Sequence, residues 1–224
     1  MGAFAFSGAH MRTTVYVDGF NLYYGCLKGT PYKWLDLKSL FEQLLERNNQ
    51  IEAIKYFTAK IKAKPGKASS PQEQQAYLRA LKAHIPEIEI HLGHFLIHNV
   101  RMPTVTPPPA TIEVVKSEEK GSDVNLSVHL LNDAWMDKYD CAVIVTNDSD
   151  MAEAMRLVKL HHPKKILGIV TPGRKNRATG QQVRTSKQLK ESADFVRTIR
   201  PGLLRKSLLP NPIPGTNISK PVDW

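Results

Sequence analysis

Acidic side chains follow the stretches of this 224-residue sequence that are typical of β-strands. Asp18 is the last residue of one such stretch, Asp148 and Asp150 come directly after another, and Asp123 stands near the start of a predicted helix. Carboxylates that meet at one edge of a sheet repel each other unless a cation neutralises them. An all-oxygen, water-accessible set suits Mg²⁺ or Mn²⁺, whereas zinc would favour His or Cys. Such a cation promotes the hydrolysis of phosphodiester bonds.

Each carboxylate also has a purely structural explanation. Asp18 and Asp148 could cap the helices that follow them, and Asp123 could complement the dipole of its own helix. A cap does not need both Asp148 and Asp150, however. The set taken together therefore favours a cation site over a series of unrelated caps.

The elements that must position these side chains alternate along the chain. Apolar and β-branched runs predict strands at 13–18, 51–61, 88–100, 111–115, 141–146, 166–171 and 195–199. Helical spacing predicts helices at 20–28, 36–48, 70–86, 121–138, 149–161 and 186–193, with Asp36 as one N-cap. This alternation predicts an α/β fold with a mostly parallel sheet and helices on both faces. Ligands bind outside the carboxyl ends of the strands in such sheets, which is where the carboxylates fall.

We expect one folded domain over residues 11–200. Residues 1–10 are interpreted as a cloning remnant, because Gly-Ala-His precedes a second methionine, Met11. Residues 201–224 contain repeated prolines that should break any regular element, and they are interpreted as a Pro-rich tail that wraps the domain or stays mobile. Two leucine pairs in this tail could dock on the domain or on a second subunit, which leaves a homodimer open.

Three short blocks of the sequence, in order, resemble the signature blocks of the NYN-domain family. They are Val17-Asp18-Gly19-Phe20-Asn21, Lys120-Gly121-Ser122-Asp123-Val124 and Val145-Thr146-Asn147-Asp148-Ser149-Asp150. One block alone would be weak evidence, whereas three in order are specific. This family belongs to the PIN-like nuclease superfamily, and the resemblance is to its bacterial branch related to LabA.

The resemblance implies a metal-dependent ribonuclease on a Rossmann-like, PIN-like sheet. It implies that Asp18, Asp123 and Asp148 are the metal-binding carboxylates. Asn21 would orient the substrate or the metal-bound water, and Asp150 would support the metal site. The expected reaction is endonucleolytic attack of a metal-activated water on RNA, which leaves a 5′-phosphate and a 3′-hydroxyl.

The distribution of charge predicts a polyanionic partner. The chain has 31 Lys and Arg against 21 Asp and Glu, a net charge of +10. The segment 156–206 alone contains 14 basic and 2 acidic residues, so the rest of the chain carries a net charge of about −2. This concentration favours a phosphate-binding face, and hence RNA, over an ordinary solvated surface.

Two basic groups are candidates for gripping the RNA backbone. Alternating lysines at the end of the predicted strand 51–61 and in the loop after it could face one side, although they could equally be a solubilising edge. The second group follows the strand 166–171 on a Gly-containing loop. The candidates are Lys60, Lys62, Lys64 and Lys67, and then Arg174, Lys175, Arg177, Arg184 and Lys187. Tyr23, Tyr24, Tyr32 and Trp34 could stack bases, but residues of this kind in a first helix are more often packing residues.

The remaining features narrow the class of protein. No apolar run approaches the ~20 residues of a membrane span, and two cysteines are too few for a disulfide framework, so we expect a reduced, cytoplasmic setting. One alternative function is a catalytically weak RNA-binding or regulatory module that uses the same pocket. Another is a phosphohydrolase with Asp18 as covalent nucleophile, but that chemistry typically has a second aspartate two residues on, where this sequence has Phe20.

Overall fold

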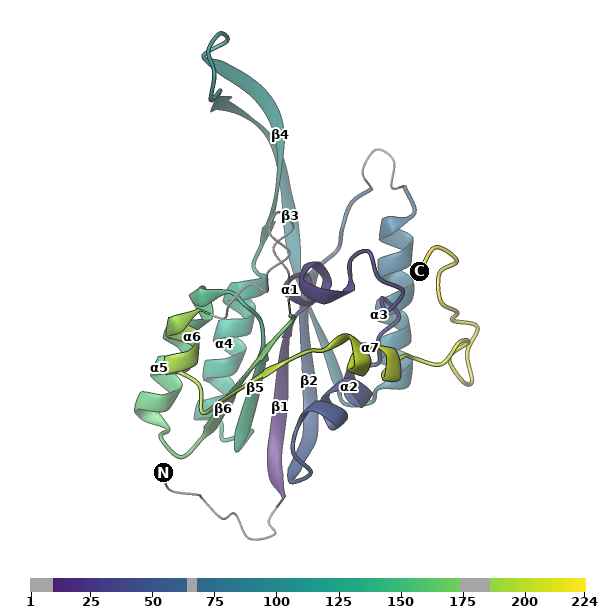
Figure 1. Cartoon of the computed structure of the whole chain (residues 1–224), viewed down its shortest axis with the longest axis vertical. Coiled ribbons are helices and arrows are strands. Elements are labelled where there is room, and N and C mark those ends of the chain that lie inside the picture. The colour runs from purple at the N-terminus through teal and green to yellow at the C-terminus, as the bar shows by residue number, and fades with distance from the viewer. Residues whose placement is uncertain (1–9, 64–67, 174–185) are drawn as a thin grey trace.

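The computed structural model describes residues 10–63, 68–173 and 186–224, and its described strands form a single sheet (Figure 1). The strand order is β4-β3-β2-β1-β5-β6-β7. The strands are β1 (Met11–Asp18), β2 (Asn49–Ala59), β3 (Ile88–Pro103), β4 (Thr111–Lys120), β5 (Cys141–Val145), β6 (Ile166–Thr171) and β7 (Phe195–Thr198). The helices are α1 (Gly19–Leu22), η1 (Tyr23–Leu27), α2 (Leu37–Leu44), α3 (Ser70–His84), α4 (Ser122–Trp135), η2 (Ser149–Met151), α5 (Ala152–His161), α6 (Lys187–Glu191) and α7 (Pro201–Lys206). Within these described ranges, no helix combines the length and the apolar character that crossing a bilayer requires.

The strand order places the carboxyl ends of β1 and β5 next to each other, at the point where the chain stops adding strands on one side of β1 and begins to add them on the other. β1 pairs in parallel with both β2 and β5, and the sheet grows outward from this centre on both sides. Only the pairing of β3 with β4 is antiparallel among the described strands. The carboxyl ends of β1 and β5 therefore flank the crevice in which a doubly wound sheet binds its ligands. The prediction of a mixed α/β fold with a mostly parallel sheet is confirmed.

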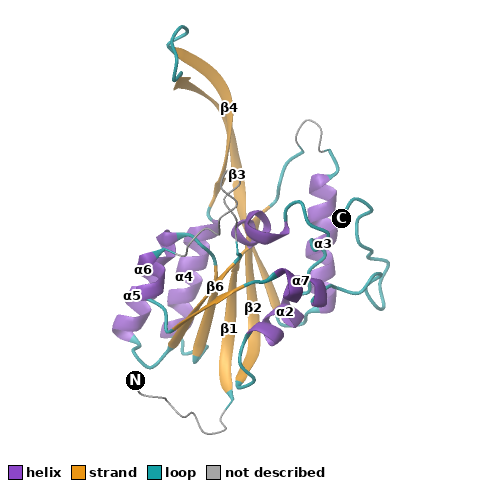
Figure 2. Cartoon of the chain, in the orientation of Figure 1, coloured by secondary structure: helices purple, strands orange, loops and turns teal. Residues whose placement is uncertain are grey.

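Helices cover both faces of the sheet (Figure 2). Val15 and Val17 of β1 pack into a core with α2, α3 and α7, whereas Tyr16 between them packs into a second core with α4 and α5. β5 is buried along its whole length, as expected for a central strand with apolar layers on both sides. The carboxyl ends of these strands are therefore held by two packed cores.

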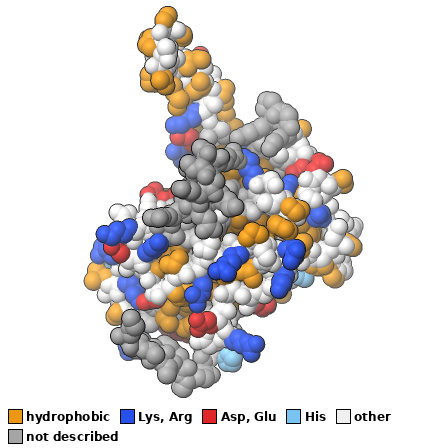
Figure 3. All heavy atoms as spheres, in the orientation of Figure 1, with side chains coloured by type: hydrophobic (Ala, Val, Ile, Leu, Met, Phe, Trp, Pro, Cys, Tyr) orange, Lys and Arg blue, Asp and Glu red, His pale blue; other side chains and the backbone are white. Residues whose placement is uncertain are grey.

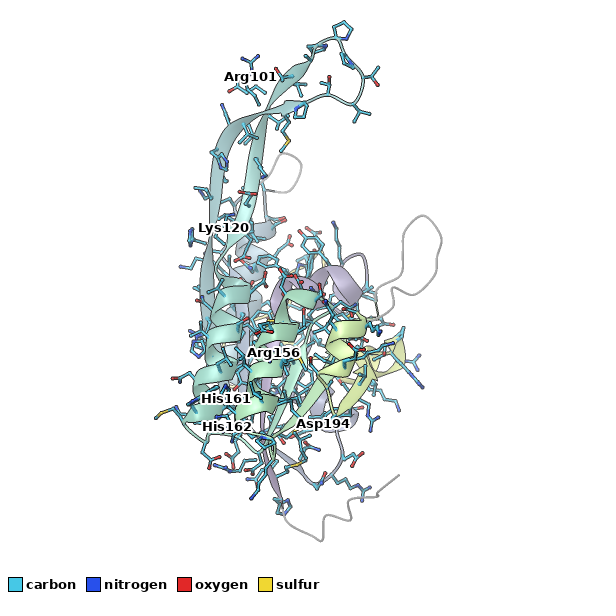
Figure 4. The ribbon with its side chains drawn as sticks, turned by 90° about the vertical axis from the view of Figure 1, so that its left-hand side faces the viewer. Arg101, Lys120, Arg156, His161, His162 and Asp194 are labelled. Carbon is cyan, nitrogen blue, oxygen red and sulfur yellow. The ribbon has the colours of Figure 1, made fainter. Side chains whose placement is uncertain are left out.

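β3 and β4 form an arm that extends beyond the sheet (Figure 1). β3 pairs with β2 only from Ile88 to Gly93, and from His94 to Pro103 it pairs with β4 alone. Figure 4 shows Arg101 near the far end of this arm and Lys120 at its root. The predicted strands 88–100 and 111–115 are both shorter than the observed β3 and β4. The sequence does not show that the two segments pair with each other and so satisfy each other's backbone N–H and C=O groups. The arm leaves the sheet at the carboxyl end of β3, the edge at which Asp18 ends β1.

The C-terminal segment packs against the domain. The prediction that its prolines exclude regular structure is wrong, because α7 begins at Pro201, where a proline tolerates the missing N–H. Leu204, Leu209 and Ile213 are buried in the core that contains α2 and α3. The Trp34 indole donates a hydrogen bond to the Pro210 carbonyl at 3.1 Å. Residues 201–224 therefore cover the face of the sheet on which α2 and α3 lie.

Candidate active site

Asp18 occupies the end of β1 with both carboxylate oxygens engaged. Its Oδ1 accepts a hydrogen bond from the Asn21 backbone N–H at 2.8 Å, and its Oδ2 accepts one from Thr146 Oγ1 at 3.2 Å. Only 6% of the residue is exposed. Burial raises the pKa of the Asp18 carboxyl, these hydrogen bonds oppose the rise, and the charge of Asp148 adds to it. Asp18 is thus both the cap of α1 and a buried carboxylate with a fixed orientation.

The residue after Asp18 has to be small. A Cβ at Gly19 would lie 2.8 Å from the backbone oxygen of Phe57 and 2.7 Å from the ring of Tyr56. The backbone of Phe57 cannot move away easily, because it belongs to the neighbouring strand β2. Glycine at this position lets α1 start directly at the end of β1, which brings Asn21 back towards the β5 loop.

The loop after β5 is tied to Asp18 through a short chain of hydrogen bonds. The Asp148 N–H donates to Thr146 Oγ1 at 3.0 Å, and Thr146 donates in turn to Asp18. Asp148 Oδ1 accepts from the Asp150 N–H at 3.0 Å and so caps η2. Asn21 Oδ1 accepts from the Asn147 N–H at 3.2 Å. Capping and clustering are therefore compatible, since the caps hold the carboxylates of Asp18 and Asp148 at the same sheet edge.

Asp123 in the first turn of α4 completes the group. Partial burial raises the pKa of the Asp123 carboxyl to about 6, and negative charge on neighbouring carboxylates adds to the rise. Those neighbours are Asp18, Asp148, Glu119 and Asp150. Four carboxylates from three segments of the chain thus act on Asp123 electrostatically. We refer to Asp18, Asp123, Asp148 and Asp150 as the carboxylate cluster.

Two polar residues beside the cluster were missed in the sequence analysis. Glu119 accepts hydrogen bonds from the backbone N–H and the Oγ of Ser122, and so caps α4 in place of Gly121, which has a φ of 100° and no side chain. The side-chain Oδ1 and Nδ2 of Asn147 are buried without a hydrogen-bond partner among the described residues. Glu119 could have been found as a glutamate three residues before a helix-starting serine. Asn147 carried no such signal, because its environment depends on how two loops meet.

The donor chemistry of the cluster suits a hard divalent cation. Its potential ligands are carboxylate oxygens, and a cation would relieve the repulsion that adds to the effect of burial on the pKa of Asp123. Asn147 adds an unpartnered carbonyl oxygen in the same loop. As the described side chains stand, no three His, Cys, Asp or Glu are grouped so that they could hold a metal ion. A bound ion would therefore require the more exposed carboxylates to rotate towards Asp18.

The predicted RNA-gripping lysines after β2 are not part of the strand. β2 ends at Ala59, so the prediction that Lys60 and Lys62 alternate on a strand is wrong. The Gln74 side chain satisfies the backbone groups at this point: it donates a hydrogen bond to the Ala59 carbonyl and accepts one from the Ile61 N–H. Lys60 and Lys62 are exposed in the following loop. Lys64, Lys67, Arg174, Lys175, Arg177 and Arg184 lie outside the described residues, whereas Lys187 is exposed at the start of α6 and lies 3.6 Å from Glu191.

A basic groove on the α2 and α7 side of the sheet was not predicted as a site. It has a volume of about 730 Å³ and is lined by Arg197, Arg200, Arg205 and Lys206 together with apolar residues such as Leu44 and Leu203. Arg197 forms an ion pair with Glu46 at 3.2 Å, whereas the side chains of Arg200, Arg205 and Lys206 make no hydrogen bond or ion pair within the described ranges. Figure 3 shows basic side chains on this face of the molecule. The groove can therefore accept an anion.

Replacing Asp123 with Asn should raise the melting temperature at pH 7.5 in EDTA by up to about 3 °C, because it removes a charge that is partly buried and repelled by its neighbours. Contact with solvent keeps this effect under ~1 kcal/mol. A raised carboxyl pKa stabilises the fold below the unfolded value near 3.8, and this contribution is lost as the pH rises through about 6. The difference from wild type should therefore shrink towards pH 4. Thermal unfolding monitored by circular dichroism at both pH values measures it.

Asp137→Asn is the control of opposite sign. Hydrogen bonds from Lys165 and Arg12 lower the pKa of Asp137, so that carboxylate stabilises the fold at neutral pH. Asp137→Asn should lower the melting temperature at pH 7.5. Equal responses of the two variants would contradict the electrostatic interpretation of the cluster.

Comparison with known proteins gives a family, a relative and a fold. The family model described as the NYN domain matches residues 12–199. The chain is 37% identical over 241 aligned positions to 6-hydroxy-3-succinoylpyridine 3-monooxygenase HspA of Pseudomonas putida strain S16, an alignment that covers 96% of this chain and 75% of that protein. The crystal structure of VPA0982, a protein of unknown function from Vibrio parahaemolyticus, matches with a TM-score of 0.54 at 17% identity and covers 91% of this chain and 99% of that one. At that identity the last match supports the fold alone.

Proposed function

Because this chain belongs to the NYN-domain family, a nuclease-like family, we propose that it is a metal-dependent endoribonuclease. The observation that carries the proposal is the carboxylate cluster at the carboxyl ends of β1 and β5, where partial burial and the charges of neighbouring carboxylates raise the pKa of Asp123. Repulsion of that kind is retained at sites that bind cations or move protons. The PIN-like relationship, the cytoplasmic setting and a homodimer stay predictions.

Asp18, Asp123 and Asp148 would hold Mg²⁺ or Mn²⁺, with Asp150 beside them. A divalent cation bound there would supply the charge that lowers the pKa of water and stabilises the phosphoryl oxygens during hydrolysis. The chain's own contribution is positioning. Thr146 and the Asn21 N–H fix the two oxygens of Asp18, and Asn21 links α1 to the β5 loop through the Asn147 N–H.

The buried position of Asp18 argues against its acting as a covalent nucleophile. Both of its oxygens already accept hydrogen bonds, and only 6% of the residue is exposed to solvent. A nucleophilic carboxylate needs an open oxygen aligned with the phosphorus atom. The arrangement supports a charge-bearing role for Asp18 better than an aspartyl-phosphate mechanism.

The basic groove supports RNA as the substrate. Arg200, Arg205 and Lys206 of this groove make no ion pair within the described ranges and can contact phosphate groups, and counterion release from such contacts drives the binding of nucleic acid. Phosphate contacts position a strand without selecting its sequence. We therefore expect broad binding of single-stranded RNA whose affinity falls steeply with salt.

The test is incubation of the purified chain with labelled single-stranded RNA and DNA in Mn²⁺, Mg²⁺ or EDTA. We expect RNA cleavage with either metal, none in EDTA, and loss of cleavage in Asp148→Asn, whose amide still accepts the hydrogen bond from Asp150. RNA that is bound but stays intact with every metal would favour the RNA-binding module instead.

A second candidate function comes from the relative rather than from the geometry. At 37% identity over 96% of the chain, the similarity to HspA makes oxidation of a hydroxylated pyridine the competing activity. Oxygen uptake with 6-hydroxy-3-succinoylpyridine and a reduced nicotinamide, with and without added flavin, tests it. Uptake that depends on the pyridine, in a chain that leaves RNA intact, would replace the nuclease proposal.

A further inference from the structure

A row of aromatic rings begins two residues after Asp18 of the carboxylate cluster. Phe20 and Tyr24 are four residues apart on α1 and η1, so their side chains lie on the same side of the helix. Their ring centroids are 6.5 Å apart and their planes differ by 22°. Phe95 of the arm meets Phe20 edge-on, with a centroid distance of 5.8 Å and an angle of 85°. The contact between Phe20 and Phe95 therefore joins residues that are 75 positions apart in the sequence.

The row runs between two of the carboxylates already described. Phe20 is two residues after Asp18. Phe95 is the direct cross-strand partner of Glu119, whose charge acts on Asp123. Opposite residues on paired strands point to the same face, so the ring of Phe95 and the Glu119 carboxylate share one face of the arm. The contact between Phe20 and Phe95 therefore joins the segment that carries Asp18 to the strand pair that carries Glu119.

Tyr24 is half exposed, although it also meets the ring of Tyr23 edge-on with a centroid distance of 5.2 Å. Its exposed fraction is 53%, whereas Trp34, another of the aromatic residues considered from the sequence, is 1% exposed within the core. The contact between Phe95 and Phe20 could serve to anchor the root of the arm, but Tyr24 lies beyond that contact. η1 is a π-helical turn, and such turns are frequent at functional sites.

Lys28 adds a cation to the exposed end of the row. Its Nζ lies over the face of the Tyr24 ring, 4.8 Å from the ring centroid. Single-stranded nucleic acids are bound by this combination of aromatic rings, on which bases stack, and nearby cations, which contact the phosphates. Duplex bases are already stacked on each other and offer no free face to such a row. The arrangement thus fits an unpaired base followed by its phosphate.

We propose that Phe95, Phe20 and Tyr24 form a stacking row for a planar heteroaromatic ring, with Lys28 beside it, and that the ring is an unpaired nucleobase of the RNA substrate. This inference rests on the proposed nuclease function and deepens it, because it selects single strands over duplexes. A pyridine ring shares the same stacking chemistry, so the test includes both sources. Tyr24 is the residue that decides between them, since it is exposed and its removal leaves the core intact.

The experiment measures binding separately from cleavage. Fluorescence anisotropy in the Asp148→Asn background compares a labelled single-stranded RNA with an oligomer of the same length and backbone that lacks bases. Stacking on an aromatic residue changes affinity by about 5- to 150-fold per base, so Tyr24→Ala should weaken RNA binding at least about 5-fold. Tyr24→Phe should retain it within about 2-fold, because the ring remains. Binding of the abasic oligomer should not depend on Tyr24.

Trp135→Ala is the matched control, because Trp135 is an aromatic residue at the far end of α4 with a similar exposed fraction of 52%. It should leave RNA affinity unchanged. Tyr24→Ala that binds RNA like its parent, or that loses affinity equally for the abasic oligomer, overturns the stacking row. Competition by 6-hydroxy-3-succinoylpyridine that depends on Tyr24, without any effect of Tyr24 on RNA, assigns the row to a small ring and overturns the nucleobase proposal. Tyr24-dependent RNA binding by a wild-type chain that cuts no RNA supports the row while refuting the nuclease.

Discussion

Asp18→Asn should lower the rate of RNA cleavage at least about 100-fold while the fold is retained, the magnitude expected when one charge-stabilising group is removed from a reacting centre. The asparagine oxygen can still accept the hydrogen bond from the Asn21 N–H, so the cap of α1 survives. What is lost is the negative charge at the centre of the carboxylate cluster. Single-turnover cleavage of labelled RNA in Mn²⁺ measures the effect.

Stability separates this effect from simple misfolding. Burial raises the pKa of Asp18, so in the absence of metal its ionised form opposes folding as the pH rises. Asp18→Asn should therefore melt in EDTA at neutral pH no lower than wild type. Asp36→Asn is the matched control, because Asp36 is also a buried cap, accepting from the Ser39 N–H at 3.0 Å, but caps α2. Asp18→Asn with wild-type cleavage would remove Asp18 from the catalytic machinery.

Lys55→Met should lower the free energy of unfolding by about 3–5 kcal/mol, the effect of leaving a buried charge without its partner. Lys55 Nζ lies 2.7 Å from Asp133 Oδ2, and both side chains are almost fully buried between β2 and α4. The same oxygen accepts from Tyr16 Oη at 2.7 Å. Among the described residues, Asp133 is the one carboxylate inside the core beneath α4, and the positive charge of Lys55 neutralises it. Urea denaturation measures the loss.

The pair can be tested even if the single variant fails to fold. Lys55→Met combined with Asp133→Asn removes both charges while the amide oxygen still accepts from Tyr16, and it should recover more than half of the loss. Lys116→Met is the surface control, because the ion pair of Lys116 with Glu118 is exposed and should contribute little to stability. A Lys55→Met loss as small as that of Lys116→Met would show that the buried pair contributes little.

The regular parts of the fold were predictable because each element carries its own pattern. The strand 166–171 is confirmed residue for residue as β6, and Asp36 is confirmed as the cap of α2. The end of β2, the length of the arm and the helix at Pro201 were not predictable. Each depends on a partner from elsewhere, such as Gln74 at the end of β2 or β4 along β3. Local sequence cannot show which distant segment will satisfy a backbone group.

The candidate site divides in the same way. Asp18 and Asp148 could be placed together because the carboxyl ends of neighbouring parallel strands must meet at one edge. Phe95 could not, because it meets Phe20 only through the antiparallel pairing of the arm, and the spacing of Glu119 to Ser122 indicates a helix cap without placing it beside Asp123. The four candidate aromatic residues looked alike in the sequence. Only burial in the folded chain separates Trp34 in the core from the exposed Tyr24.

Direct binding of Mn²⁺, measured by electron paramagnetic resonance without RNA, tests the central claim that the carboxylate cluster holds a divalent cation. Free Mn²⁺ gives a signal that falls as the ion binds to protein, so wild type, Asp18→Asn and Asp36→Asn can be titrated side by side. We expect wild type and Asp36→Asn to bind Mn²⁺ alike and Asp18→Asn to bind at least about 10-fold more weakly, as expected when a ligating charge is removed. Equal binding by Asp18→Asn and wild type would contradict the account, because the bound ion would then lie away from the carboxylate cluster.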